Sequence, residues 1–138
     1  MLRHRGFTLL ELLIVLSIAA LMTVGASLAL PSGAERQLGQ EAQRLVTRLE
    51  TARARSRASG QPIVALVDEH GMQFSGGAVD NSLSGDWLHA QTSARPVQLL
   101  LGPEPVIAVQ GVQLLGPESR SLWVATDGVR PFTIGDAP

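Results

Sequence analysis

The 138-residue sequence predicts an α+β fold, in which a long N-terminal hydrophobic helix continues into an amphipathic helix packed on an antiparallel β-sheet. Three observations predict it. The first is an apolar run over residues 7–30 that contains a single charge, Glu11. The second is a helical repeat of apolar residues over 35–59. The third is a series of short apolar segments, separated by turn residues, that begins after Gly60.

The apolar run is long enough to cross a membrane. Leu12–Leu30 contains 19 residues without a charge, and a helix of this length measures about 28 Å, close to the hydrocarbon thickness of a bilayer. We therefore expect a transmembrane helix over 7–30. The alternative is a secretory signal peptide cut near Ser32-Gly33-Ala34, but its apolar stretch would be shorter. Because a carboxylate inside a membrane is costly, Glu11 is expected to have a function and a partner.

Cleavage between Gly6 and Phe7 would supply that partner. The cut creates a positively charged α-amino group about one helical turn before Glu11. Within one chain the two groups are close but poorly aligned, whereas in staggered chains the amine of one chain can meet the carboxylate of the next. Since an unpaired charge is expensive in a low dielectric, the pair favours one register. The segment is predicted to be stored in a membrane and to assemble into a helical fibre.

The residues around this cut resemble a known leader. Arg5–Val15, with the sequence RGFTLLELLIV, is similar to the class III leader of type IV pilins and type II secretion pseudopilins. The resemblance implies a type IV pilin-like fold and a leader peptide over residues 1–6. It also implies cleavage after Gly6 by a prepilin peptidase on the cytoplasmic side, N-methylation of Phe7, and fibre assembly through Glu11.

The composition excludes several classes of chemistry. The absence of lysine excludes a P-loop lysine, a Schiff base and a Ser-Lys dyad, and the absence of cysteine excludes disulfides and thiolate sites. Without Arg3 and Arg5, nine arginines face twelve acidic residues, which is not the balance of a nucleic-acid-binding protein. These two leader arginines predict an inner-membrane protein with a cytoplasmic N-terminus and a periplasmic C-terminal domain. We expect no enzymatic activity and no cofactor.

The second helix follows a break. Pro31-Ser32-Gly33 predicts either a kink in one long helix or a short hinge between two helices. Beyond it, apolar residues recur at steps of three and four and form a narrow stripe: Leu38, Ala42, Leu45, Leu49 and Ala52. This stripe predicts an amphipathic stalk helix within residues 31–60, which ends at Gly60 and Pro62 and packs on a sheet.

The remaining residues, 61–138, are predicted to form a β-rich globular domain on the periplasmic side. Tight turns are expected at Glu69-His70-Gly71 and Asp127-Gly128, and Pro131 places the last strand at a sheet edge. Strands are expected at residues 63–67, 72–75, 86–90, 97–101, 106–109, 112–115, 122–126 and 129–134.

Two segments of this domain resemble one branch of the family. The helix end with Ser59–Val64, and the hairpin Leu122–Ile134, are similar to GspH/FimT-type minor pseudopilins. The resemblance implies a structural subunit near the tip of a periplasmic pseudopilus that drives export of folded proteins across the outer membrane. Implied partners are other major and minor pseudopilins, the prepilin peptidase, the inner-membrane assembly platform, and membrane lipid before assembly. The alternative is a minor pilin of a type IV pilus or competence system that binds DNA, although nucleic acid is not the expected partner.

Three arginines near the end of the second helix are the best candidates for a partner contact. Arg53, Arg55 and Arg57 could meet an acidic neighbour in the fibre, or DNA. The simpler interpretation is a solvated helix end, where positive charge is favoured by the helix dipole.

Other candidate sites have weaker support. His4, His70 and His89 show no metal-ligand spacing, and Asp80 and Asp86 show no calcium-loop spacing, so no metal site is expected. A hydrolytic trio of Asp86, His89 and a nearby serine, Ser82 or Ser84, lacks a nucleophile-elbow sequence. Trp87 and Trp123 lie in apolar segments and are expected to pack in the core.

Overall fold

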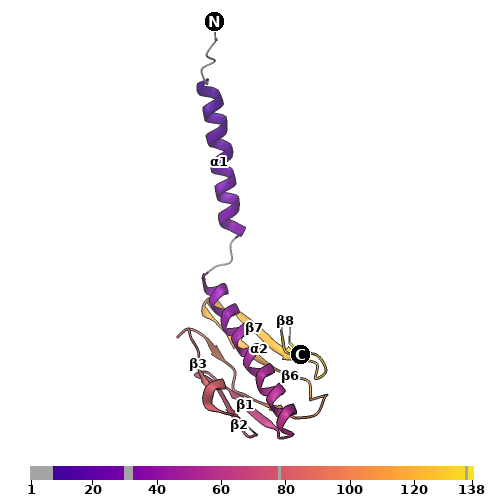
Figure 1. The fold of residues 1–138 in the computed structure, drawn as a ribbon. Helices are drawn as coiled ribbons and strands as arrows, with labels where there is room; N and C mark the ends of the chain where they lie inside the picture. The colour runs from indigo at the N-terminus through magenta and orange to yellow at the C-terminus, as the bar shows by residue number, and fades with distance from the viewer. Residues whose placement is uncertain (1–7, 30–32, 78, 136) are drawn as a thin grey trace. The chain divides into compact units, whose positions relative to one another are not determined.

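The computed structural model describes residues 8–29, 33–77, 79–135 and 137–138. The chain divides into two units, 1–32 and 33–138. Figure 1 shows their helices and strands. The leader, the predicted cleavage site between Gly6 and Phe7, and the predicted break at Pro31-Ser32 lie outside the described residues.

The described part of the first unit, residues 8–29, forms the helix α1 at Leu9–Ala29. A helix is therefore confirmed within the predicted range. In the part of the chain that the structure describes, no helix combines the length and the hydrophobicity that crossing a membrane requires.

The second unit is built on α2, Gly33–Ser59, which begins two residues before the predicted start. The predicted stripe from Leu38 to Ala52 is confirmed, because all five of its residues are buried. Three polar residues of α2 are buried as well, which the apolar pattern did not predict: Glu41, Arg53 and Ser56.

Two antiparallel sheets cover the buried side of α2 (Figure 1). The first has the order β3-β2-β1-β5 and consists of β1 at Ile63–Val67, β2 at Gly71–Ser75, β3 at Gly85–Asp86 and β5 at Val97–Leu101. Its strands alternate between core and solvent: Ala65, Phe74 and Leu99 lie opposite one another across three strands, and all are buried.

The second sheet has the order β4-β6-β7-β8. It consists of β4 at Ser93–Ala94, β6 at Gln110–Leu115, β7 at Ser121–Thr126 and β8 at Thr133–Gly135. Buried Val112, Leu114 and Val124 join the same core as the α2 stripe. The predicted α+β fold with a helix on antiparallel strands is confirmed, and the strands divide into two sheets.

Two predicted strands are not strands. Of the segment predicted at 86–90, only Asp86 pairs with β2, together with Gly85 before it. Trp87 lies beyond the strand, where its backbone N–H donates to the carbonyl of His70 and its ring N–H to that of Asp68. Residues 106–109 are irregular, because the N–H of Ile107 bonds to the carbonyl of Gly128 instead of a strand. The sequence pattern missed β4, whose two residues are too few to show a period.

The connection between β7 and β8 is longer than the two-residue turn that was predicted at Asp127-Gly128. Residues 127–132, here called the closing loop, separate β7 from β8, so β8 begins at Thr133 and not at Val129. Gly128 has a φ of 89° and lies so close to Ile107 that a Cβ would meet its carbonyl oxygen. The loop therefore bends toward the 105–108 segment before it returns, and β8 forms an edge of its sheet as Pro131 predicted.

The turn between β6 and β7 has an unfavourable backbone conformation. Glu118 and Ser119 have φ angles of 58° and 57°, in the left-handed region that favours glycine and asparagine. Arg120, which follows them, binds Glu35 in the first turn of α2 at 3.2 Å. The turn thus connects the second sheet to the start of α2.

Candidate functional site

The predicted assembly residue, Glu11, lies in the first turn of α1. The helix starts from Thr8, whose hydroxyl oxygen accepts the backbone N–H of Glu11 at 3.2 Å and whose carbonyl accepts that of Leu12 at 3.2 Å. Negative charge is favourable at this helix end because it complements the helix dipole. The carboxylate itself is exposed and makes no hydrogen bond or ion pair with any described residue. Gly6 and Phe7, the other predicted processing residues, lie outside the described residues.

Over Leu9–Met22 the surface of α1 is apolar on nearly all sides. The large apolar side chains from Leu9 to Met22 are 49% to 81% exposed. The hydroxyls of Ser17 and Thr23 donate to carbonyls four residues earlier, each at 2.8 Å, so they present little polarity outward. Exposed apolar surface of this kind marks a protein or membrane contact. The unit therefore carries one free carboxylate on an otherwise apolar helix.

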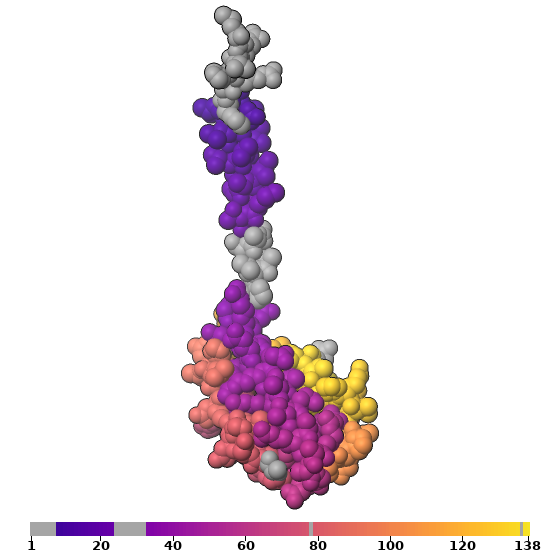
Figure 2. All heavy atoms as spheres, in the orientation of Figure 1, coloured from indigo at the N-terminus to yellow at the C-terminus, as the bar shows by residue number. Residues whose placement is uncertain are grey.

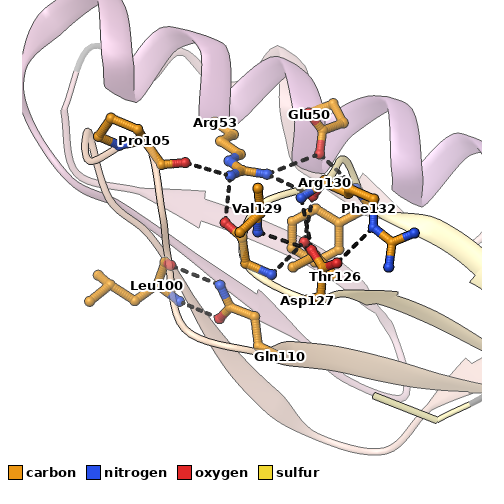
Figure 3. Close-up of polar contacts among 11 residues, drawn as sticks. Glu50, Arg53, Leu100, Pro105, Gln110, Thr126, Asp127, Val129, Arg130 and Phe132 are labelled. Carbon is orange, nitrogen blue, oxygen red and sulfur yellow. Dashed lines mark hydrogen bonds and ion pairs between the residues drawn. The ribbon is translucent and has the colours of Figure 1, made fainter.

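Arg53, one of the three predicted contact residues, is buried and only 1% exposed. Its guanidinium donates to the carbonyls of Gly128 at 2.9 Å, Arg130 at 3.1 Å and Pro105 at 3.2 Å (Figure 3). The planar fork of arginine donors suits several carbonyls at once. The predicted partner contact of Arg53 is therefore wrong. The buried side chain joins the closing loop and the 105–108 segment to α2, and it presents no surface to another molecule.

The closing loop is held by further contacts around Arg53. Glu50 accepts the N–H of Phe132 at 2.8 Å, and the hydroxyl of Thr126 donates to the carbonyl of Arg130 at 2.6 Å (Figure 3). Asp127 accepts the N–H and the guanidinium of Arg130 and the N–H of Val129. These bonds, first that from the Arg130 backbone, lower the pKa of Asp127 from 3.8 to about 2.

Arg55 and Arg57 differ from Arg53 and from each other. Arg55 pairs with Asp80 at 2.9 Å. Bonds from the Ser82 hydroxyl and then from Arg55 lower the pKa of Asp80 from 3.8 to about 2. Arg57 is exposed and has no hydrogen bond or ion pair within the described parts of the chain. Of the three arginines, Arg57 alone remains fully available to another molecule.

On the side of α2 away from Arg53, charged residues bind residues 80–89, here called the flanking loop, which includes the short strand β3. Arg44 and Arg48 donate to the carbonyls of Asp86 at 2.8 Å and Leu83 at 2.6 Å. Burial, followed by repulsion from Arg44, lowers the pKa of Arg48. Glu41, fully buried, accepts the N–H groups of Leu88 and His89. In Figure 2 the magenta surface of α2 is bordered by atoms of the segment that follows β2 and by the yellow C-terminal strands.

Sequence reasoning missed these contacts, although their spacing carries a signal. Glu41, Arg44 and Arg48 recur at steps of three and four beside the apolar stripe, so they lie at the border between core and solvent. Charged residues at such a border are well placed to bind loop carbonyls and N–H groups.

The other candidate sites of the sequence are His70, His89, Asp80, Asp86 and the two nearby serines, with His4 outside the described residues. Among the described residues, no group of three or more His, Asp or Glu side chains is placed to hold a metal ion. The Ser82 hydroxyl donates to Asp80, the Ser84 oxygen accepts the N–H of Phe74, and neither serine bonds to His89 among the described residues. Of the two tryptophans, Trp87 is buried and Trp123 is half-buried.

The chain is similar to known proteins in its N-terminal motif and over much of its length. Residues 1–27 match the family model described as the prokaryotic N-terminal methylation motif. Over 105 residues the chain is 31% identical to "Type II secretion system protein H" of Aeromonas hydrophila, a match that covers 71% of this chain and 57% of that protein. The chain thus spans little more than half the length of the curated relative it matches. No solved structure matches the chain. The motif and the relative together confirm that the chain resembles a type II secretion pseudopilin of the GspH type.

Proposed function

We propose that the chain is a structural minor pseudopilin of a type II protein secretion system. It would assemble near the tip of a periplasmic pseudopilus that drives folded proteins across the outer membrane. The methylation motif and the similarity to a secretion protein H support this role. The observation that carries the proposal is α1, an exposed apolar helix with a single carboxylate that lacks a partner among the described residues.

Processing follows from the same segment. The prepilin peptidase cuts between Gly6 and Phe7 on the cytoplasmic side, and Phe7 becomes N-methylated. Before assembly the helix is held in the inner membrane with the C-terminal domain in the periplasm, as the leader arginines and the uncharged run of the sequence support. Membrane lipid then covers the apolar side chains that α1 exposes.

Assembly exchanges lipid for neighbouring helices. The α-amino group of Phe7 on one chain meets the Glu11 carboxylate of the next, and this pair fixes the register because either charge alone is costly in a low dielectric. Major and minor pseudopilins and the assembly platform are the proposed partners. In the globular domain, exposed Arg57 is the proposed contact for an acidic group on one of them.

The experiment that tests this function is N-terminal sequencing and mass measurement of the mature chain from cells with a type II secretion system. We expect the chain to start at N-methylated Phe7. Cross-linking in the same cells should recover other pseudopilins. A mature chain that starts at another residue, or that cross-links to no pseudopilin, would contradict the proposed function.

The DNA-binding alternative has little support in the domain. Six arginines bind acidic or main-chain groups of the same domain: Arg44, Arg48, Arg53, Arg55, Arg120 and Arg130. These contacts reduce the positive charge available for phosphates. A gel shift of residues 33–138 with DNA at two salt concentrations tests the alternative, and we expect no shift at either.

A further inference from the structure

The start of α1 contains half of a capping box. In this motif a Ser or Thr accepts the backbone N–H of the residue three positions later, and a Glu at that later position accepts the backbone N–H of the Ser or Thr in return. Thr8 and Glu11 have this spacing. The first bond is present, since the Thr8 hydroxyl oxygen accepts the N–H of Glu11 at 3.2 Å.

The return bond is not made. The carboxylate of Glu11 has no hydrogen-bond partner among the described residues, the Thr8 backbone included. The Thr8 hydroxyl thus satisfies one of the free N–H groups at the helix start without using the side chain of Glu11. Such an acceptor is hard to replace near a membrane, where water is scarce.

We propose that Thr8 is a positioning residue for Glu11. Its hydroxyl fixes the start of α1 and leaves the carboxylate free for the amine of a neighbouring chain, so this role rests on the proposed assembly function. Without the hydroxyl, the carboxylate becomes the nearest side-chain acceptor for the N–H groups of the first turn. Capping its own helix would then compete with pairing between chains.

The test compares Thr8→Val, which keeps the shape of the side chain but removes the hydroxyl, with Thr8→Ser, which keeps the hydroxyl. Each full-length variant is made in cells with a type II secretion system, and its cross-linking to other pseudopilins is divided by the amount of mature chain in the membrane. We expect Thr8→Val to lower this ratio about five-fold, the factor typical of a lost N-cap, and Thr8→Ser to retain it. Hydrogen exchange of the Glu11 amide in detergent micelles should be faster in Thr8→Val alone.

Glu11→Ala separates this proposal from the proposed function. If Glu11→Ala loses cross-linking but Thr8→Val does not, the positioning role is overturned and the proposed function stands. Equal losses in Thr8→Val and Thr8→Ser also overturn it, because the hydroxyl would then not be the cause. If Glu11→Ala cross-links normally, the proposed function is contradicted and the positioning role fails with it.

Discussion

The two helices use their apolar and charged residues in opposite ways. In α1 the large apolar side chains from Leu9 to Met22 are exposed, and the carboxylate of Glu11 has no partner among the described residues. In α2 the apolar stripe is buried, and charged residues on both flanks bind loops of the same domain. The difference separates two uses of charge: most charged side chains of α2 hold loops of their own domain, whereas the carboxylate of α1 binds no described residue of its own chain.

The largest expected effect follows from removing the free charge of α1. Glu11→Ala should reduce incorporation into the fibre at least about 100-fold, because the amine of the neighbouring chain would be left unpaired in a low dielectric. Membrane insertion and cleavage after Gly6 should be unchanged. Cross-linking to other pseudopilins and N-terminal sequencing measure these quantities. Normal incorporation would show that α1 and α2 do not differ in the proposed way.

Removing the buried charge of α2, at Arg53, should lower the stability of the domain and leave pairing between chains unaffected. Arg53→Ala leaves three loop carbonyls without their donor and opens a buried space, so the free energy of unfolding of residues 33–138 should fall by about 3 to 5 kcal/mol. Urea denaturation measures it. Arg57→Ala is the matched control on the same helix and should change stability by less than about 0.5 kcal/mol. Equal effects of the two substitutions would refute the structural role of Arg53.

Local patterns predicted the parts of the molecule that depend on nearby residues. The residues of the leader motif, Glu11 included, are adjacent in the sequence. The spacing of apolar residues predicts the buried stripe of α2 and strands such as β1 and β7. The role of Arg53 could not be predicted this way, because its acceptors Gly128 and Arg130 lie 75 and 77 residues further along the chain. The division into two sheets also depends on distant pairing. The sequence further gave no sign that Glu118 and Ser119 adopt left-handed conformations, which neither residue type favours.

A smaller effect on stability is expected at the turn between β6 and β7, which contacts the start of α2 through Arg120. Ser119→Gly should raise the free energy of unfolding of residues 33–138 by about 1 kcal/mol, since glycine adopts a φ of 57° without a clash. Ser121→Gly, in regular strand β7, is the control and should lower stability instead. Thermal denaturation compares the two variants. A loss of stability in Ser119→Gly would mean that the side chain makes a contact that outweighs the strain.

The smallest effect concerns pH and distinguishes a contact made by α2 from one made within the closing loop. Asp80 and Asp127 both have a pKa of about 2, below the ordinary 3.8, so the stability they contribute is complete above about pH 4 and is lost as the pH falls toward 2. Arg55→Gln should raise the pKa of Asp80, because Asp80 pairs with Arg55 of α2. The pKa of Asp127 should stay unchanged, because Asp127 pairs with Arg130 within the closing loop. NMR titration of the two carboxyl groups measures both values in one sample. A shift of both pKa values would mean that the two loops are coupled, and that α2 controls the closing loop through more than Glu50 and Arg53.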